Sequence, residues 1–362
     1  MSREFTIHVH DRGSLIMLHF DNDYLVGAHP RVLEALCEDN GREHTGYGLD
    51  DVCEHAAQRI RMECGTPDAE VRFLVGGTQT NRTVIDSTLR PFEGVVSAES
   101  GHISVHEAGA IESSGHKVLT LPHHEGRIDA DDLRSYLDAF EQDENHDHMV
   151  RPGMVYVSHP TEFGTLYSSA ELHAISAVCH DHGIPLYLDG ARLGYGLAAE
   201  GTDVTLKTIA ECCDVFYIGG TKVGALFGEA VVVTRPHRRD GFGIDGFFTQ
   251  IKLNGALLAK GWLLGLQFNT LFTDGLYVDI ARNGVEQAMR IRRGFTEKGY
   301  RRLYDSPTNQ QFLILDDATL DRLRKDVSFS FWEKYDDDHT IVRFATSWAT
   351  RPQDVDALLE LI

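Results

Sequence analysis

The sequence has 362 residues, of which 34 are Lys or Arg and 55 are Asp or Glu, so its formal net charge is −21. This acidic balance argues against a nucleic-acid backbone or an anionic membrane surface as a partner. Hydrophobic residues make up 42% of the chain, as in ordinary globular proteins. Because the chain shows neither an apolar stretch of about 18 residues nor an apolar segment after a basic start, we expect a cytoplasmic protein.

The cysteines and histidines carry no metal or disulfide signature. The 6 cysteines lack CxxC spacing, which predicts reduced, mostly buried thiols rather than a zinc site or a disulfide framework. The 19 histidines match neither HExxH nor a Cys/His finger, so no metal site is predicted and we expect them at the surface or in loops.

From about residue 70, short β-rich runs alternate with helical patterns, which is typical of a parallel sheet covered by helices. Strands are predicted at residues 71–76, 95–98, 117–121, 154–158, 185–188, 215–219 and 230–234. Helices are predicted at residues 77–89, 102–113 and 129–140, and another from a capping box of Ser168 and Glu171. The acidic residues 141–151 are predicted to be a surface loop.

The pattern changes after about residue 245. Long helical patterns cover residues 255–272 and 278–298, followed by strands at 311–315 and 341–347, with a helix between them, and by a C-terminal helix at 352–361. We therefore predict three parts: an N-terminal arm at 1–20, a large domain at 21–245 and a smaller α+β domain at 246–362.

One lysine follows an apolar strand directly. Lys222 lies among glycines in FYIGGTKVG. An amine that leaves water there loses solvation, which lowers its pKa toward the nucleophilic range needed to bind a carbonyl cofactor covalently. Taken alone, the segment fits a surface lysine in a turn equally well.

A carboxylate stands about thirty residues upstream, where another strand ends in DGAR. A carboxylate beneath a pyridine nitrogen keeps that nitrogen protonated and makes the ring an electron sink, a role that suits Asp189. The alternatives for Asp189 are a helix cap and a structural ion pair with Arg192.

The third feature is the turn GGTQTN at residues 76–81, between a predicted strand and a helix. Free backbone N–H groups and the helix dipole favour a phosphate there, although a plain tight turn explains the segment as well. The order of the three features, a phosphate-binding turn, a strand-end carboxylate and a strand-end lysine, points to pyridoxal phosphate.

From about residue 15 to its end the chain resembles the threonine aldolase and β-eliminating lyase family of pyridoxal-phosphate enzymes, particularly the low-specificity L-threonine aldolase and phenylserine aldolase branch. The matching stretches include ESGHISVHEAGAIE, HPTEFGTLYS, LYLDGARLG and IGGTKVGALFGEAVVV. The resemblance implies the α/β aspartate-aminotransferase fold, also called fold type I, with a large, mainly parallel sheet domain and a smaller C-terminal domain.

The resemblance also implies roles at the cofactor. Lys222 corresponds to the lysine that binds the cofactor covalently, and Asp189 to the partner of the ring nitrogen. Gly77 and Thr78 correspond to the pair that binds the phosphate, and His102 to the imidazole that stacks on the ring.

Other matches concern the substrate. Arg192 matches an arginine near the cofactor hydroxyl and the substrate carboxylate, and Arg343 matches the small-domain arginine that grips that carboxylate. Many relatives have a serine where this chain has Asn22, whose amide can still donate a hydrogen bond. A second histidine of other branches is missing, so His102, Glu162 and an ordered water stay open as the base that takes the substrate hydroxyl proton.

The arginine that relatives extend to a neighbouring subunit's phosphate has no clear match here. Lys252 or Lys260 is able to supply that charge, and the alternative for both is an ordinary solvated lysine. The resemblance implies a homodimer or homotetramer with shared active sites.

We therefore predict a carbon–carbon lyase that cleaves a β-hydroxy-α-amino acid of the L-threonine, L-allo-threonine or phenylserine type to glycine and an aldehyde. The alternative with the same cofactor is β-elimination on a cysteine-like or aromatic amino acid. A non-catalytic protein that keeps the fold is a third hypothesis, and the joint presence of Lys222 and Asp189 argues against it.

Overall fold

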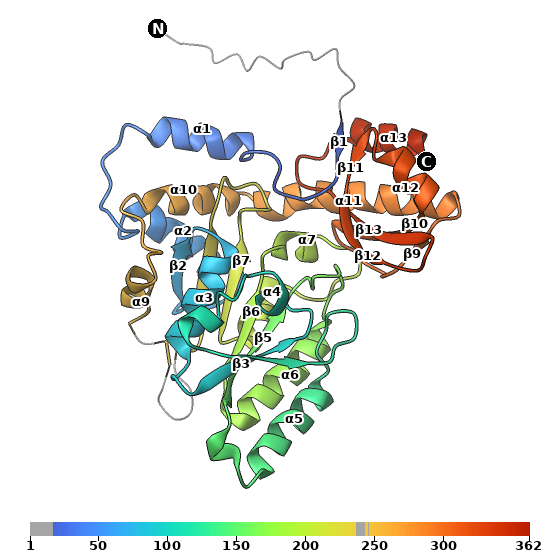
Figure 1. The fold of residues 1–362 in the computed structure, drawn as a ribbon. Helices are drawn as coiled ribbons and strands as arrows, with labels where there is room; N and C mark the ends of the chain where they lie inside the picture. The colour runs from blue at the N-terminus through green and yellow to red at the C-terminus, as the bar shows by residue number, and fades with distance from the viewer. Residues whose placement is uncertain (1–16, 237–242, 245) are drawn as a thin grey trace.

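A central sheet organises the computed structural model, which describes residues 17–236, 243–244 and 246–362 (Figure 1). Among the described residues the sheet has seven strands in the order β2-β8-β7-β6-β5-β3-β4. Strand β8 is antiparallel to both of its neighbours, and the other pairs are parallel. The strands are β2 (Glu70–Leu74), β3 (Glu93–Ala98), β4 (Val118–Leu121), β5 (Arg151–Ser158), β6 (Leu186–Asp189), β7 (Val215–Gly219) and β8 (Glu229–Val233). These are the seven strands predicted for the large domain.

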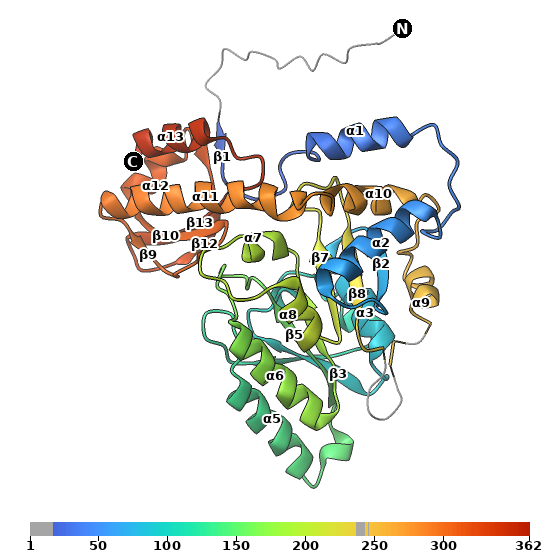
Figure 2. The same ribbon diagram turned by 180° about the vertical axis from the view of Figure 1, so that it is seen from behind.

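The two faces of this sheet carry separate hydrophobic cores, because successive side chains of a strand point to opposite faces. In β5, Val155 and Val157 belong to one core, and Met154 and Tyr156 to the other. The first core is covered by α2 (Asp51–Cys64), α5 (Ala130–Gln142), α6 (Ser169–His182) and α8 (Leu206–Cys212), and the second by α3 (Gly77–Thr88) and α9 (Phe247–Leu253), as the opposite views in Figures 1 and 2 show.

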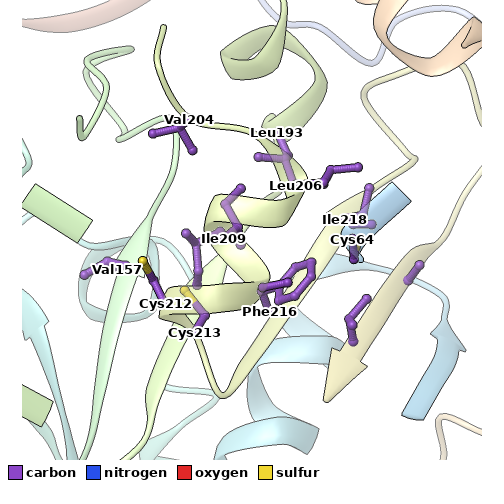
Figure 3. Close-up of a cluster of buried hydrophobic side chains, with 14 of the residues drawn as sticks. Cys64, Val157, Leu193, Val204, Leu206, Ile209, Cys212, Cys213, Phe216 and Ile218 are labelled. Carbon is purple, nitrogen blue, oxygen red and sulfur yellow. The ribbon is translucent and has the colours of Figure 1, made fainter. Parts of the chain in front are cut away.

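Part of the first core lies under α8 (Figure 3). There Ile209 and Cys212 of the helix pack with Val157 and Phe216 of the sheet. Of the six cysteines, five are buried and free and only Cys37 is exposed, which confirms the expectation of mostly buried thiols. Among the described residues no helix is long and apolar enough to cross a membrane.

Two predicted helices are shorter than expected. The helix predicted at 102–113 is only α4 (His102–Val105), because Ala108 and Gly109 have φ values of 51° and 73°, which a right-handed helix does not accept. The pattern at 255–272 contains α10 (Trp262–Leu271) alone, since Gly255 takes a φ of 68° and ends the preceding segment. Helix α1 (Pro30–Asp39), α2 and α9 were not predicted.

The smaller domain is built on a four-stranded antiparallel sheet in the order β12-β13-β10-β9. Its elements are β9 (Arg301–Arg302), β10 (Gln310–Asp316), α12 (Asp317–Leu323), β12 (Ser330–Lys334), β13 (His339–Ala345) and α13 (Pro352–Leu361). β1 (Leu18–His19) pairs in parallel with β11 (Val327–Ser328), and Phe20 joins this domain's core. The described end of the predicted N-terminal arm is therefore part of the smaller domain, while residues 1–16 lie outside the described ranges.

Helix α11 (Leu276–Glu297) connects the two domains. Its first half, including Ala281 and Val285, belongs to the core of the large sheet, and Ile291 and Phe295 belong to the core of the smaller domain. α10 also packs in the large core through Phe268. On these packing grounds we propose that the smaller domain begins within α11 rather than at residue 246.

Candidate active site

A cavity of about 310 Å³ lies where the parallel strands end. Parallel strands present their carboxyl ends at one edge of a sheet, and ligands of open α/β sheets bind there. The cavity is lined by seven of the residues predicted from the sequence: Gly77, Thr78, His102, Glu162, Asp189, Arg192 and Lys222.

Asp189, at the end of β6, is buried and accepts four hydrogen bonds. Asn81 Nδ2 donates to Asp189 Oδ2 over 2.9 Å. The Tyr156 hydroxyl donates to the same oxygen over 2.6 Å. The backbone N–H of Ala191 donates to Oδ1 over 2.9 Å, and the Tyr217 hydroxyl donates to the same oxygen. All four donors stabilise the ionised carboxylate.

Asn81 joins Asp189 to the histidine that is expected to stack on the cofactor. Its Nδ2 also donates to Glu107 Oε1 over 2.7 Å, while its Oδ1 accepts from the Tyr187 hydroxyl over 2.8 Å. His102 Nδ1 lies 2.8 Å from the same Glu107 oxygen. Since a carboxylate accepts, Nδ1 carries a proton in this contact. Burial alone would raise the pKa of Asp189, but the charge of His102 and the hydrogen bonds outweigh it and lower that pKa.

Lys222 follows β7 after Gly220 and Thr221 and faces the same cavity. Burial lowers the pKa of its amine, and the Arg192 charge lowers it further, against the opposing effect of nearby carboxylates. The Tyr195 hydroxyl donates to the backbone oxygen of Lys222 over 2.6 Å and fixes this part of the chain. The lysine is thus held in a setting that favours a neutral, nucleophilic amine.

The turn before α3 suits a phosphate. Gly76 is the N-cap residue of this helix, and no side chain caps the first turn, which leaves its backbone N–H groups for a ligand. Gly77 and Thr78 line the cavity. A Cβ atom on Gly77 would lie only 3.2 Å from the Tyr217 hydroxyl, which favours glycine at this close approach. The amine, the anionic carboxylate and this helix terminus together form the donor set that pyridoxal phosphate requires.

Arg192 is fixed by a carboxylate that sequence reasoning did not identify. Its Nε and Nη2 donate to Asp23 over 2.7 and 3.0 Å, and Asn309 Nδ2 donates to Asp23 over 2.9 Å. Among the described residues, no group hydrogen-bonds Arg192 Nη1, so this nitrogen is left for a ligand. Asp23 joins the N-terminal segment, the loop after β6 and the smaller domain at one point.

Arg343, in β13, does not line the cavity itself. It donates to Gln310 Oε1, to the Asp21 backbone oxygen and to Ser330 Oγ over 3.1, 3.2 and 3.3 Å. Burial, reinforced by the charge of Arg192, lowers the pKa of Arg343 to about 10. Its Nε is buried without a partner among the described residues. Two guanidinium groups that repel each other favour a nearby anion.

The structure does not bring Asn22 into the cavity. Its amide donates to Asp21 Oδ2 over 3.0 Å and accepts from the Tyr24 backbone N–H over 3.1 Å, so these local bonds hold it in the turn. Tyr24 lines the cavity instead. Lys252 and Lys260 also lie outside the described lining, and Lys252 Nζ is over the ring of Tyr47, 5.1 Å from its centroid. Their role toward a neighbouring subunit stays a prediction.

The tyrosines that hold Asp189 and Asn81 were missed, although the sequence carries a signal for them. Tyr156, Tyr187 and Tyr217 each stand two residues before the end of a buried strand. Tyr156 and Tyr187 are direct neighbours in the sheet. Three phenols on one face of adjacent strands indicate a shared polar role on that face.

One group of possible metal ligands exists among the described residues, formed by Asp138, Glu141 and His182. His182 contacts Asp138 over 3.3 Å through Nε2 and Glu141 over 2.9 Å through Nδ1. The group lies on α5 and α6, and none of its members lines the cavity. We interpret it as a surface ion-pair cluster.

Comparisons with known proteins identify the family of this chain. The sequence model of the beta-eliminating lyase family matches residues 29–299. A threonine aldolase structure from Leishmania major has a TM-score of 0.90 and 41% identity, covering 95% of this chain and 98% of that one. A low-specificity L-threonine aldolase from a Pseudomonas species is 28% identical over 91% of this chain and 93% of its own length.

The predicted fold type is confirmed by aspartate aminotransferase of Thermus thermophilus, which covers 96% of this chain and 91% of its own with a TM-score of 0.69. At 15% identity this likeness concerns the fold alone. The family match covers most of the chain and includes Asp189 and Lys222. The protein therefore belongs to the beta-eliminating lyase family.

Proposed function

We propose that the protein is a pyridoxal-phosphate-dependent lyase that cleaves a β-hydroxy-α-amino acid to glycine and an aldehyde. One observation carries the proposal: the cavity combines the buried, ionised Asp189, the Lys222 amine of lowered pKa and the uncapped terminus of α3. The similarity to the Leishmania threonine aldolase supports this choice within the family.

The residues divide the work at the cofactor. When bound, pyridoxal phosphate supplies an electron sink for the pair freed as the Cα–Cβ bond breaks. Asp189 would hold the proton on the ring nitrogen, and the backbone N–H groups of Gly77 and Thr78 would bind the phosphate. Lys222 would anchor the group covalently, and His102 would cover its ring.

The substrate is held by its carboxylate between Arg343 and Nη1 of Arg192. This grip would orient the substrate, and its orientation would select the bond that breaks. Two groups are placed to take the hydroxyl proton, His102 Nε2 and the Glu162 carboxylate. Burial raises the pKa of Glu162, and its Oε1 accepts from the His102 backbone N–H over 2.9 Å and from Ser158 Oγ over 2.6 Å, which leaves Oε2 for the proton.

Product identification tests the function. Purified enzyme is incubated with L-threonine, L-allo-threonine, L-phenylserine and L-cysteine, with Lys222→Ala as the control. We expect glycine and an aldehyde from at least one hydroxy amino acid, and no turnover in the control. Pyruvate and ammonia from L-cysteine, without aldehyde from the other three, would establish the β-eliminating alternative instead.

We also propose a cytoplasmic homodimer or homotetramer with shared sites. Tyr24 lines the cavity and is 56% exposed, and the apolar Leu25, Val26 and Leu226 are exposed as well. A second copy that covers these side chains would also close the cavity. Light scattering of the purified protein measures the assembly, and a single-chain mass would contradict this proposal.

A further inference from the structure

Gln310 is a buried amide of the smaller domain to which no role has so far been given. It begins β10 and is 0% exposed. It pairs with Ala345 of β13, so its side chain lies on the same face of the sheet as that of Arg343. Gln310 Oε1 accepts a hydrogen bond from Arg343 Nη1 over 3.1 Å. Gln310 Nε2 is buried without a partner among the described residues. In this part of the chain, the side chain of Gln310 therefore makes a single hydrogen bond, to Arg343.

The hydrogen-bond acceptors of Arg343 are all uncharged. They are the amide oxygen of Gln310, the backbone oxygen of Asp21 and the hydroxyl of Ser330. Among the described residues, no carboxylate lies within 4.0 Å of this guanidinium, although the charges of Asp21 and Asp23 act on it from farther away. Removal of a cation from water without a close anion is costly. Arg343 therefore keeps a charge that is available to an anionic ligand.

Arg192 differs from Arg343 in this respect. Asp23 accepts hydrogen bonds from both Nε and Nη2 of Arg192, so this pair is neutral as a whole. Its free Nη1 offers a ligand a hydrogen bond but little net charge. Asn309, which directly precedes Gln310, donates to Asp23 over 2.9 Å. Two consecutive amides thus serve the two arginines in different ways. Asn309 supports the anion beside one guanidinium, and Gln310 gives the other an uncharged acceptor.

We propose that Gln310 is a positioning residue that holds Arg343 through an uncharged acceptor and so reserves its charge for the substrate carboxylate. Gln310 acts through Arg343 and does not itself line the cavity. A glutamate at this position would hold the guanidinium equally well but would neutralise it. The substrate carboxylate would then meet an ion pair in place of an uncompensated cation. This inference rests on the proposed role of Arg343 toward the substrate carboxylate.

Gln310→Glu tests the need for an uncharged acceptor. This substitution keeps one oxygen for Arg343 and changes only an NH2 group that has no partner among the described residues. We expect KM for L-threonine to rise by about tenfold or more and kcat to change by less than about threefold, because the substrate loses a charge-assisted contact. Urea unfolding of the cofactor-free protein checks the fold. The midpoint should be no lower than that of the wild type, since the new carboxylate gains a partner and no hydrogen bond is lost.

Gln310→Met is the matched control, because it removes the acceptor without adding a charge. We expect it to raise KM by less than about threefold, since Arg343 keeps its charge and two other acceptors. Ethanolamine, an amine without a carboxylate, is the second probe. The concentration at which it changes the visible absorption of the holoenzyme should be the same in the wild type and Gln310→Glu. An unchanged KM in Gln310→Glu, an equal rise in Gln310→Met, or an equal loss of affinity for ethanolamine would overturn the proposal.

A second pair of variants applies if Gln310→Glu unfolds at a lower urea concentration or does not fold. Ser330→Asp places a carboxylate at another acceptor of Arg343, in a half-buried position, and Ser330→Asn is its control. A higher KM for Ser330→Asp than for Ser330→Asn is expected, and equal values would refute the proposal.

A failure of the proposed function is distinguishable from a failure of this inference. An unchanged KM in Arg343→Ala would show that Arg343 does not hold the substrate carboxylate. A raised KM in Arg343→Ala together with an unchanged KM in Gln310→Glu would refute the role of Gln310 alone. If the products are pyruvate and ammonia, the same variants are compared through KM for L-cysteine, which also carries a carboxylate.

Discussion

Replacement of Asp23 by Asn should destabilise the fold strongly. Asp23 is 1% exposed and accepts hydrogen bonds from Arg192 and Asn309. The amide has nearly the same shape, but it removes the charge and turns N–H groups toward a guanidinium. Arg192, whose side chain is 14% exposed, is then a largely buried cation without its anion. Removal of one partner of such an ion pair lowers the free energy of unfolding by more than the intact pair contributes to it.

Two arguments give the size of the loss in free energy of unfolding. Burial alone would raise the pKa of Asp23. The charges of Arg192 and Lys222 and the hydrogen bonds outweigh burial and lower that pKa from 3.8 to about 2. This difference corresponds to about 2.5 kcal/mol of folding free energy. Breaking a buried ion pair costs about 3–5 kcal/mol. We therefore expect Asp23→Asn to lower the free energy of unfolding by about 2.5–5 kcal/mol at neutral pH.

The pH dependence has a defined sign. Because the pKa of Asp23 is lower in the folded state than in the unfolded state, its contribution is fully present above pH 3.8 and is lost as the pH falls through about 2. The stabilities of the wild type and Asp23→Asn should therefore converge in that acidic range. At neutral pH the difference should be constant.

Urea unfolding followed by circular dichroism measures the effect. Asp21→Asn is the matched control, since Asp21 carries the same group two residues away at the surface, beside His19. We expect that control to cost less than about 1 kcal/mol. A double-mutant cycle with Arg192→Gln isolates the coupling of the pair. A loss below about 1 kcal/mol for Asp23→Asn at neutral pH would refute the reasoning.

Two further substitutions test the site. Asp189→Asn should keep the cofactor bound but reduce aldehyde release by more than about a hundredfold, since an amide does not hold the pyridinium proton, and turnover within about tenfold of the wild type would remove Asp189 from that role. Arg343→Ala should raise KM for L-threonine by about 10- to 100-fold with an unchanged visible spectrum, because a charge-assisted contact contributes about 1.5–3 kcal/mol. Loss of cofactor in that variant would show that Arg343 supports the fold instead.

The strands and their terminal residues were predictable because the information is local. Apolar runs between turn residues marked every strand of the large sheet, and the chemistry of Lys222 and Asp189 required only their positions after a strand. The parallel arrangement then placed these residues at one edge, as the structure shows. The pattern at 102–113 misled because its periodicity is helical, whereas the left-handed Ala108 and Gly109 interrupt it.

Contacts between distant segments were not predictable in this way. Asp23 and Arg192 are 169 positions apart, and Asp23 also contacts Asn309 of the smaller domain, so the pair depends on how distant segments pack. Asn81 reaches Asp189 and Glu107 from a helix on the sheet's face, so its function depends on the fold rather than on any motif. The resemblance suggested Asn22 because many relatives have a serine at this position, yet the adjacent Asp23 is the buried residue.

Helix α11 gives the molecule a mechanical property. Its 22 residues span about 33 Å and contribute to two cores, so one continuous helix joins the two domains. A bend of about 5° near its middle would move the far end by about 1.4 Å. Arg343 travels with that end, whereas Lys222 stays with the large sheet. The curvature of α11 therefore sets the distance between Arg343 and Lys222. Substitutions along this helix can alter substrate affinity while every cavity residue stays the same.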